Sequence, residues 1–130
     1  MKQIKRLKRE KVSLFLAAAV LSLGILSGCG GESKEAKEAR MTGIEQLNAG
    51  NYQDAIDSFG KALDESDGIV NSFELDVLKY RGEAEYKLAD YKAAAQTYGI
   101  LAEVDGGKAE YLYYKAASEA AAGQAEDAEK

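Results

Sequence analysis

A short sequence pattern that is repeated 39 residues later constrains the fold of this chain more than any other feature. Residues 50–56 read Gly-Asn-Tyr-Gln-Asp-Ala-Ile, and residues 89–95 read Ala-Asp-Tyr-Lys-Ala-Ala-Ala, so that Tyr91 aligns with Tyr52. A period of this length is typical of folds built from stacked copies of one small unit. In such folds each copy buries its apolar face against the next copy.

Each copy also carries a glycine twelve positions before its alanine. Gly43 precedes Ala55 in this way, and Gly82 precedes Ala94. Because a glycine has no side chain, it lets another backbone approach closely. We therefore expect each glycine to face the alanine of its own copy. An aromatic residue stands four positions after each alanine, and we expect it to fill the groove toward the next copy. These aromatic residues are Phe59 and Tyr98.

A third, partial copy lies near the end of the sequence, at residues 123–128, with Ala116 in the place of the glycine and Ala128 as the alanine. After Gln124 only a stub of under two helical turns remains, and a helix this short does not persist alone in water. We therefore interpret the chain as a fragment of a longer array or a shortened product. A packed, ordered helix over the last six residues would contradict this interpretation.

The spacing of apolar residues predicts helices between the glycines. Ile56, Phe59 and Leu63 recur at intervals of three and four residues, which places them on one helical face. Glycines at 50, 106, 107 and 123 mark the breaks between segments. We expect helices near residues 35–48, 52–65, 72–88, 91–103 and 109–122, with a stub after 124.

Helix pairs with a small residue, a turn, a tyrosine and an alanine at these spacings resemble tetratricopeptide (TPR) repeats. The tryptophan of the family pattern is replaced here by Ala39, Leu78 and Leu112. The resemblance covers residues 36–130 and implies an all-α fold of antiparallel helix-hairpin repeats, a TPR-like solenoid. It would hold about two complete repeats and a truncated third. The competing interpretation is an irregular bundle of helical hairpins.

The first 28 residues have the layout of a secretory signal peptide. Six of the first eleven residues are basic, and residues 12–26 carry no charge. The run Leu26-Ser27-Gly28-Cys29 then resembles the lipobox of bacterial lipoproteins. The resemblance implies cleavage between Gly28 and Cys29 and attachment of acyl chains such as palmitate to Cys29. An uncleaved anchor helix is the alternative.

These features predict three segments. They are a lipoprotein signal peptide over residues 1–28, a lipidated flexible tether over residues 29–35, and the repeat domain over residues 36–130. The resemblance to lipoproteins places the protein on the bacterial cell membrane, lipid-anchored at the extracytoplasmic face.

The charge of the part after the leader narrows the classes of function. Without the first 28 residues the chain keeps 11 basic and 21 acidic residues, a formal charge of −10. Such a surface argues against nucleic acid as a partner. The chain has no histidine, the most common general base near neutral pH and the most common metal ligand, and its single cysteine is expected to carry lipid. We therefore expect no enzyme, no cofactor and no bound metal.

Binding is the function that the resemblance implies. In the TPR family the first helices of successive repeats line a concave groove. The residues placed there in this sequence are Arg40, Asn48, Lys79, Tyr80, Glu83, Lys87, Tyr113 and Tyr114, together with Ile44, Leu47 and Tyr86. Tyrosines are frequent at binding hot spots, although Tyr80 and Tyr113 are equally compatible with a packing role.

We expect a membrane-anchored, extracytoplasmic adaptor or scaffold that binds a cell-envelope protein or peptide. One alternative is an accessory domain, itself not catalytic, of a longer cell-envelope enzyme such as a peptidase or cell-wall hydrolase. Another is a structural spacer, which would expose no aromatic residues in the groove.

Overall fold

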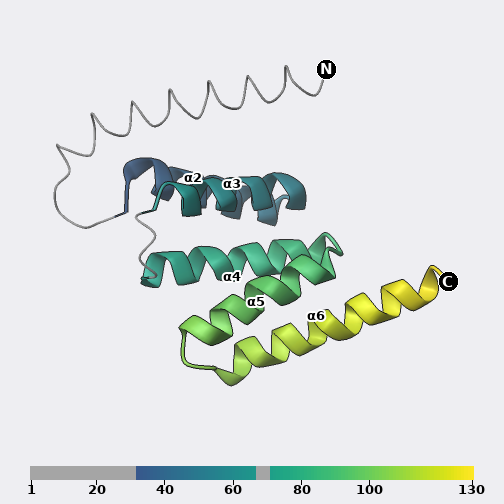
Figure 1. Ribbon diagram of the computed structural model, residues 1–130. Helices are drawn as coiled ribbons and strands as arrows, with labels where there is room; N and C mark the ends of the chain where they lie inside the picture. Colours follow the sequence, from purple (N-terminus) through teal and green to yellow (C-terminus); the bar gives the residue numbers. More distant parts are fainter. Residues whose placement is uncertain (1–31, 67–70) are drawn as a thin grey trace, which may run out of the picture. The chain divides into compact units, whose positions relative to one another are not determined.

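The computed structural model describes residues 32–66 and 71–130, and helices are the regular secondary structure in these ranges. The helices are α2 (Lys34–Asn48), α3 (Tyr52–Asp64), α4 (Ser72–Lys87), α5 (Tyr91–Val104) and α6 (Ala109–Ala128) (Figure 1). This confirms the all-α fold class. The starts and ends lie within one residue of the expected positions, except for the end of α6.

All five helices belong to one unit, Glu32–Lys130. Each helix packs against the helix that follows it in the chain, and α2 also touches α4. Figure 1 shows α5 lying between α4 and α6, and α5 packs against both. Short turns join α2 to α3 and α4 to α5, so the helices of each pair run in opposite directions.

These two turns have the same backbone structure. The residue after the helix cap has a positive φ in both, 81° at Gly50 and 66° at Ala89. The amides of Gly50 and Asn51 donate to carbonyls of the last turn of α2, and those of Ala89 and Asp90 do the same in α4, at 2.9 to 3.1 Å. This is the pattern that closes a helix with a left-handed residue. The 39-residue repeat read from the sequence is therefore present in the backbone as well.

Side-chain caps fix where α2 and α4 begin. The hydroxyl of Ser33 accepts from the amide of Ala36 at 3.0 Å, and the side chain of Asn71 accepts from the amides of Phe73 and Glu74 at 2.8 and 3.2 Å. Each cap satisfies amides that have no partner within the helix. Because α2 begins at Lys34, the last two residues expected in the tether form its first turn.

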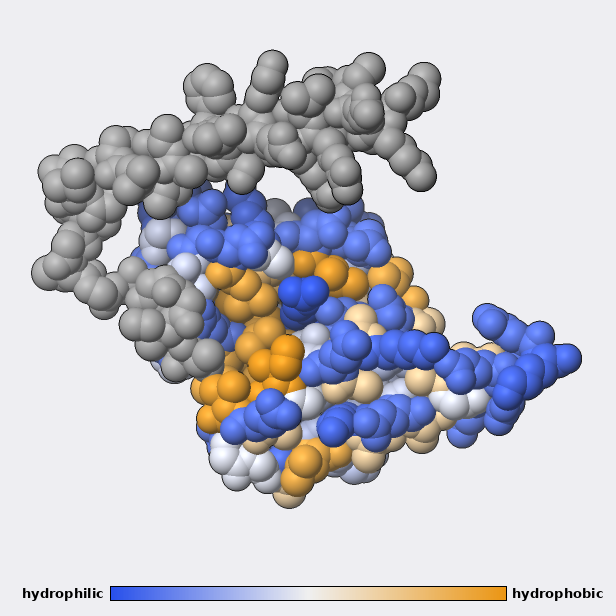
Figure 2. Space-filling view, in the orientation of Figure 1, coloured by the Kyte–Doolittle hydropathy of each residue, from blue (hydrophilic) through white to orange (hydrophobic). Residues whose placement is uncertain are grey.

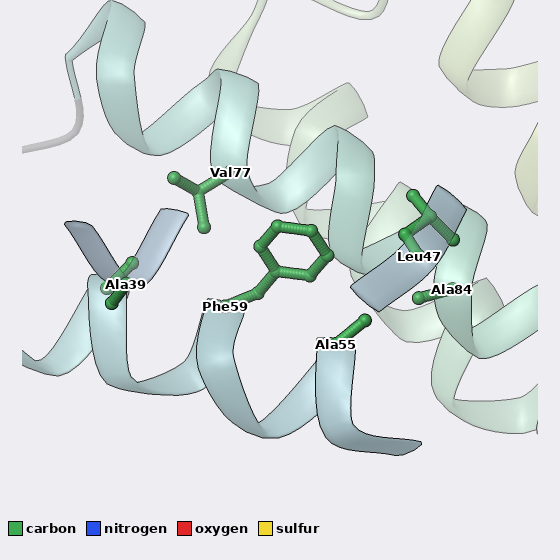
Figure 3. Packing of buried hydrophobic residues seen from close by; sticks show 7 residues of the cluster. Ala39, Leu47, Ala55, Phe59, Val77 and Ala84 are labelled. Atoms are coloured by element: carbon green, nitrogen blue, oxygen red, sulfur yellow. The ribbon is translucent and has the colours of Figure 1, made fainter. Parts of the chain in front are cut away.

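The hydrophobic core consists of two clusters. The first joins α2, α3 and α4 around Phe59 and contains Ala39, Leu47, Ala55, Phe59, Ala62, Val77 and Ala84 (Figure 3). The second joins α5 and α6 and contains Ala94, Tyr98, Leu101, Ala102 and Tyr111. Each cluster contains the aromatic residue that the repeat placed four positions after its alanine, Phe59 in the first and Tyr98 in the second.

Two of the helical glycines, Gly43 and Gly82, make room for these aromatic rings. A methyl group at Gly43 would lie 2.5 Å from Cε1 of Phe59, and one at Gly82 would lie 3.0 Å from Cζ of Tyr98. The nearest neighbours of the glycines are thus the rings, and not the alanines that the sequence led us to expect. A ring lying across a helix needs the space of a missing side chain, which explains why glycine stands at both positions.

The expected helix break at Gly123 is wrong. Helix α6 continues through it to Ala128, so Ala116 and Ala128 lie on one helix instead of facing each other across a third pair. Glycine in a helix interior costs only about 1 kcal/mol relative to alanine, and its neighbours here are alanine, glutamine and glutamate, which favour helix. Residues 123–130 are exposed to solvent. Lys92 of α5 and Glu126 of α6 form an ion pair at 2.5 Å.

The expected leader, Cys29 and the beginning of the expected tether lie outside the described residues. Across residues 32–66 and 71–130, no helix has both the length and the apolar character needed to span a membrane.

Candidate functional site

A hollow of about 490 Å³ opens between α4 and α6. It is lined by Asp76, Lys79, Tyr80 and Glu83 of α4, by Glu110, Tyr111 and Tyr114 of α6, and by Tyr98 of α5. We call it the larger hollow. Half of its lining residues are tyrosines, and the other half are charged.

A second hollow of about 220 Å³ adjoins the first, and we call it the smaller hollow. Its lining residues are Glu83, Tyr86, Lys87, Tyr98, Tyr113, Tyr114 and Ala117. Glu83, Tyr98 and Tyr114 line both hollows, so the two form one continuous groove, named here the α4–α6 groove.

Helical periodicity explains the two walls of the groove. On α4, positions 76, 79, 80, 83, 86 and 87 recur at three- and four-residue intervals and so share one face. On α6, positions 110, 111, 113, 114 and 117 do the same. Tyr98 of α5 lies between the walls, with its ring against Gly82. The floor of the groove therefore depends on the absence of a side chain at Gly82.

Aromatic stacking connects the tyrosines of the groove. The rings of Tyr98 and Tyr114 stack with centroids 5.1 Å apart, and Tyr113 meets Tyr114 edge-on at 5.5 Å. On the other side, Tyr80 stacks on the buried ring of Phe59 at 5.9 Å. The groove is thus attached at both walls to the two core clusters.

Two ion pairs flank the groove. Arg40 of α2 reaches Asp76 of α4, with Nη2 2.5 Å from Oδ2, and its guanidinium lies 5.6 Å from the ring centroid of Tyr80. On α4 itself, Lys87 Nζ lies 2.8 Å from Glu83 Oε1. This hydrogen bond raises the pKa of the Lys87 ammonium. The lysine therefore keeps its charge beside the smaller hollow.

The Tyr98 hydroxyl lies in a negative environment. Burial raises the pKa of Tyr98 from 10 to about 12, and the nearby charges of Glu83, Glu85 and Glu110 act in the same direction. Both effects disfavour the phenolate, since it would add a negative charge to a poorly hydrated and already acidic place. Tyr98 thus stays protonated over the physiological range of pH.

A buried carboxylate next to the groove has a structural role. Glu85 is only 2% exposed, and it accepts from Arg81 Nε at 2.8 Å and from Thr97 Oγ1 at 2.6 Å. These partners satisfy the charge within the protein and tie α4 to α5. No cluster of acidic or cysteine side chains suited to a metal ion occurs in residues 32–66 and 71–130.

The structure brings most of the residues expected in the groove together. Seven of them line it, namely Lys79, Tyr80, Glu83, Tyr86, Lys87, Tyr113 and Tyr114. Leu47 belongs instead to the first core cluster, and Ile44 packs against that cluster. Arg40 does not line the groove, but it contacts two residues that do: it forms an ion pair with Asp76, and its guanidinium lies over the ring of Tyr80. Asn48 is exposed at the end of α2 and lines neither hollow.

Five lining residues were not expected from the sequence, namely Asp76, Tyr98, Glu110, Tyr111 and Ala117. Four of them lie one helical turn from residues that were named, so the helical period could have found them. Tyr98 was assigned a packing role only. It packs on Gly82 and lines the groove at the same time.

Exposed aromatic residues occur in the groove. The exposed fraction is 69% for Tyr113, 41% for Tyr114 and 42% for Tyr86, while Tyr80 is half-buried. A structural spacer was expected to lack such residues. On the face seen in Figure 2, hydrophilic residues surround smaller hydrophobic areas.

No family model, no curated protein and no solved structure matches this chain.

Proposed function

We propose that this protein is an adaptor that binds a segment of another cell-envelope protein in the α4–α6 groove and is held on a membrane through Cys29. The main support for this proposal is that exposed tyrosines and charged residues together line one continuous groove. Tyrosine offers a large contact area at a small cost in conformational entropy, which suits a binding surface.

The proposal includes a TPR-like arrangement of the helices. Three observations support it: each helix packs on its neighbour in the chain, the turns after α2 and α4 share one backbone pattern, and glycines on α2 and α4 receive aromatic rings from the following helix. In such an array α2, α4 and α6 are the first helices of their repeats. The groove between α4 and α6 is then the place where a partner is expected.

The membrane anchor rests on the sequence of the leader and of Cys29. The intact mass of the protein purified from its own membrane tests it. We expect a chain that begins at Cys29 and carries at least two acyl chains, because a single chain gives only marginal binding to a bilayer. A mass that includes residues 1–28 would contradict the anchor and leave the groove proposal standing.

Site-directed photo-crosslinking in the producing cells tests the binding function. A photoreactive phenylalanine analogue replaces Tyr113 in the full chain, and a matched chain carries it at Lys61, which is exposed on α3 outside the groove. We expect a discrete adduct with another protein from position 113 and none from position 61. Alanine at Tyr86, on the opposite wall, should weaken that adduct.

The outcomes separate the adaptor from the spacer. Equal adducts at both positions would indicate nonspecific contact, and an absence of adducts at both positions would contradict protein binding by the groove.

A further inference from the structure

The charges that line the larger hollow are mostly negative. Three carboxylates, Asp76, Glu83 and Glu110, face it together with one ammonium group, that of Lys79. Arg40 and Lys87, the cations that pair with the first two carboxylates, do not line the larger hollow. Glu110 forms no ion pair with any residue of the described ranges. A cation entering this hollow would therefore meet carboxylates on both walls.

The aromatic walls also suit a cation. Tyr80, Tyr98, Tyr111 and Tyr114 surround the larger hollow, and the negative face of an aromatic ring attracts a positive charge. The protein itself places cations against two of these rings. Arg40 lies 5.6 Å from the centroid of Tyr80, and Lys108 Nζ lies 6.0 Å from that of Tyr111.

The raised pKa of Tyr98 agrees with a negative electrostatic potential at the floor of the groove. Glu83 and Glu110 raise the pKa of its hydroxyl, in addition to the larger effect of burial. A potential that opposes a phenolate favours a cation at the same place. The formal charge of −10 on residues 29–130 adds a long-range attraction for a basic partner.

The smaller hollow has a different character. Four tyrosines and Ala117 line it, and its two charged residues, Glu83 and Lys87, form an ion pair with each other at 2.8 Å. A lining of this kind suits an apolar or aromatic side chain. In an extended peptide, residues i and i+2 point to the same side and lie about 7 Å apart. The two hollows share three lining residues, so they can accept two such side chains together.

We propose that the α4–α6 groove recognises an extended peptide segment that carries a basic side chain for the larger hollow and, two residues away, an aromatic side chain for the smaller one. This proposal rests on the proposed function of the groove and names the chemistry of its ligand. The carboxylates and tyrosine rings hold the cation, and the tyrosines of the smaller hollow hold the aromatic ring.

Fluorescence anisotropy with labelled synthetic peptides tests the proposal on the full chain in nonionic detergent. The probes are hexapeptides with arginine and phenylalanine two residues apart, made in both orders. In matched probes citrulline, glutamate or alanine replaces one of the two residues. Citrulline keeps the shape of arginine and removes its charge. We expect this replacement to weaken binding about tenfold, and glutamate to abolish binding. Alanine in place of phenylalanine should also weaken it.

Removing a negative charge from the larger hollow and removing a positive one should change the affinity for the arginine peptide in opposite directions. Glu110→Gln should weaken binding of the arginine peptide about three- to fivefold, while Lys79→Gln should strengthen it by a similar factor. Glu103→Gln on α5 makes the same change of charge at an exposed position outside the groove and should have little effect. Raising NaCl from about 50 to 500 mM should weaken binding in every case, because salt screens exposed charges.

Three results would overturn the proposal. They are equal binding of the arginine and citrulline peptides, tighter binding of the glutamate peptide, and no binding of the arginine peptides in either order. None of them contradicts the adaptor function, which the adduct at position 113 tests separately. Absence of that adduct, with the charge preference intact in vitro, would instead contradict the adaptor role in the cell.

Discussion

Replacing Gly43 with alanine tests the packing that holds the first three helices together. The new methyl group would lie 2.5, 2.7 and 3.0 Å from Cε1, Cδ1 and Cζ of Phe59, well inside the normal contact distance. Phe59 is fully buried and stacks on Tyr80 at 5.9 Å, so its ring has no free space to enter. The helices must separate, or the ring must leave its preferred rotamer.

The expected cost follows from two opposing effects. Overpacking of a core costs about 1–3 kcal/mol, while alanine is about 1 kcal/mol better than glycine inside a helix. Because the three distances are all so short, we expect the upper part of the first range and a net loss of about 2 kcal/mol. In a domain of this size that lowers Tm by roughly 8–15 °C.

Gly60 provides a matched control in the next helix. A methyl group there would meet no atom within 4 Å. Gly60→Ala should therefore stabilise the protein by about 0.5–1 kcal/mol, through helix propensity and the reduced entropy of the unfolded chain. The same chemical change is thus expected to act with opposite sign at two helical glycines.

Urea denaturation followed by circular dichroism at 222 nm measures both variants. Phe59→Leu serves as the partner in a double-mutant cycle, since a smaller side chain should relieve the clash and make the double variant more stable than the sum of the single effects. If Gly43→Ala is as stable as the natural protein, or if the cycle shows no coupling, the close fit of ring to glycine is refuted.

Three further predictions concern turns, caps and titration. Asn71→Ala removes an acceptor of two amide hydrogen bonds and should cost about 1 kcal/mol in urea denaturation, whereas Asn51→Ala, at a cap without a side-chain bond, should be nearly neutral. Ala89 has a left-handed backbone, and Ala89→Gly removes that strain, so the variant should have an unfolding free energy about 1 kcal/mol higher than the natural protein. A variant less stable than the natural protein would contradict the turn geometry. Because the folded state raises the pKa of Tyr98 to about 12, its contribution to stability is complete below pH 10 and is lost as the pH rises toward 12. Tyr98→Phe should remove that part of the alkaline decline in unfolding free energy, and identical declines in the two proteins would contradict the shift.

Most of the secondary structure could be predicted because its signals are local. The spacing of Ile56, Phe59 and Leu63 predicts one helical face regardless of what that face contacts. The exception is Gly123. A glycine ends a helix only when the backbone takes a left-handed turn, as at Gly50, and the identity of the residue does not reveal which case applies.

The groove could be predicted in part, since seven of its residues follow from the resemblance to a repeat family and from the helical period. Asn48 was placed there on the same reasoning, yet it lines neither hollow. Tyr98 was missed because its position in the repeat indicated only a packing role, whereas its side chain both packs against Gly82 and lines the groove. That double role depends on the spacing of three helices.

The sequence by itself determined most of the helices, the positions of two matching turns and the acidic charge of residues 29–130. These properties depend on residues close together in the chain or on composition alone. Only the tertiary structure decided that aromatic rings, and not alanines, occupy the space left by Gly43 and Gly82. It alone also placed three carboxylates around Tyr98. The reason is physical: the volume available to a side chain, and the potential around it, are set by helices distant in the sequence.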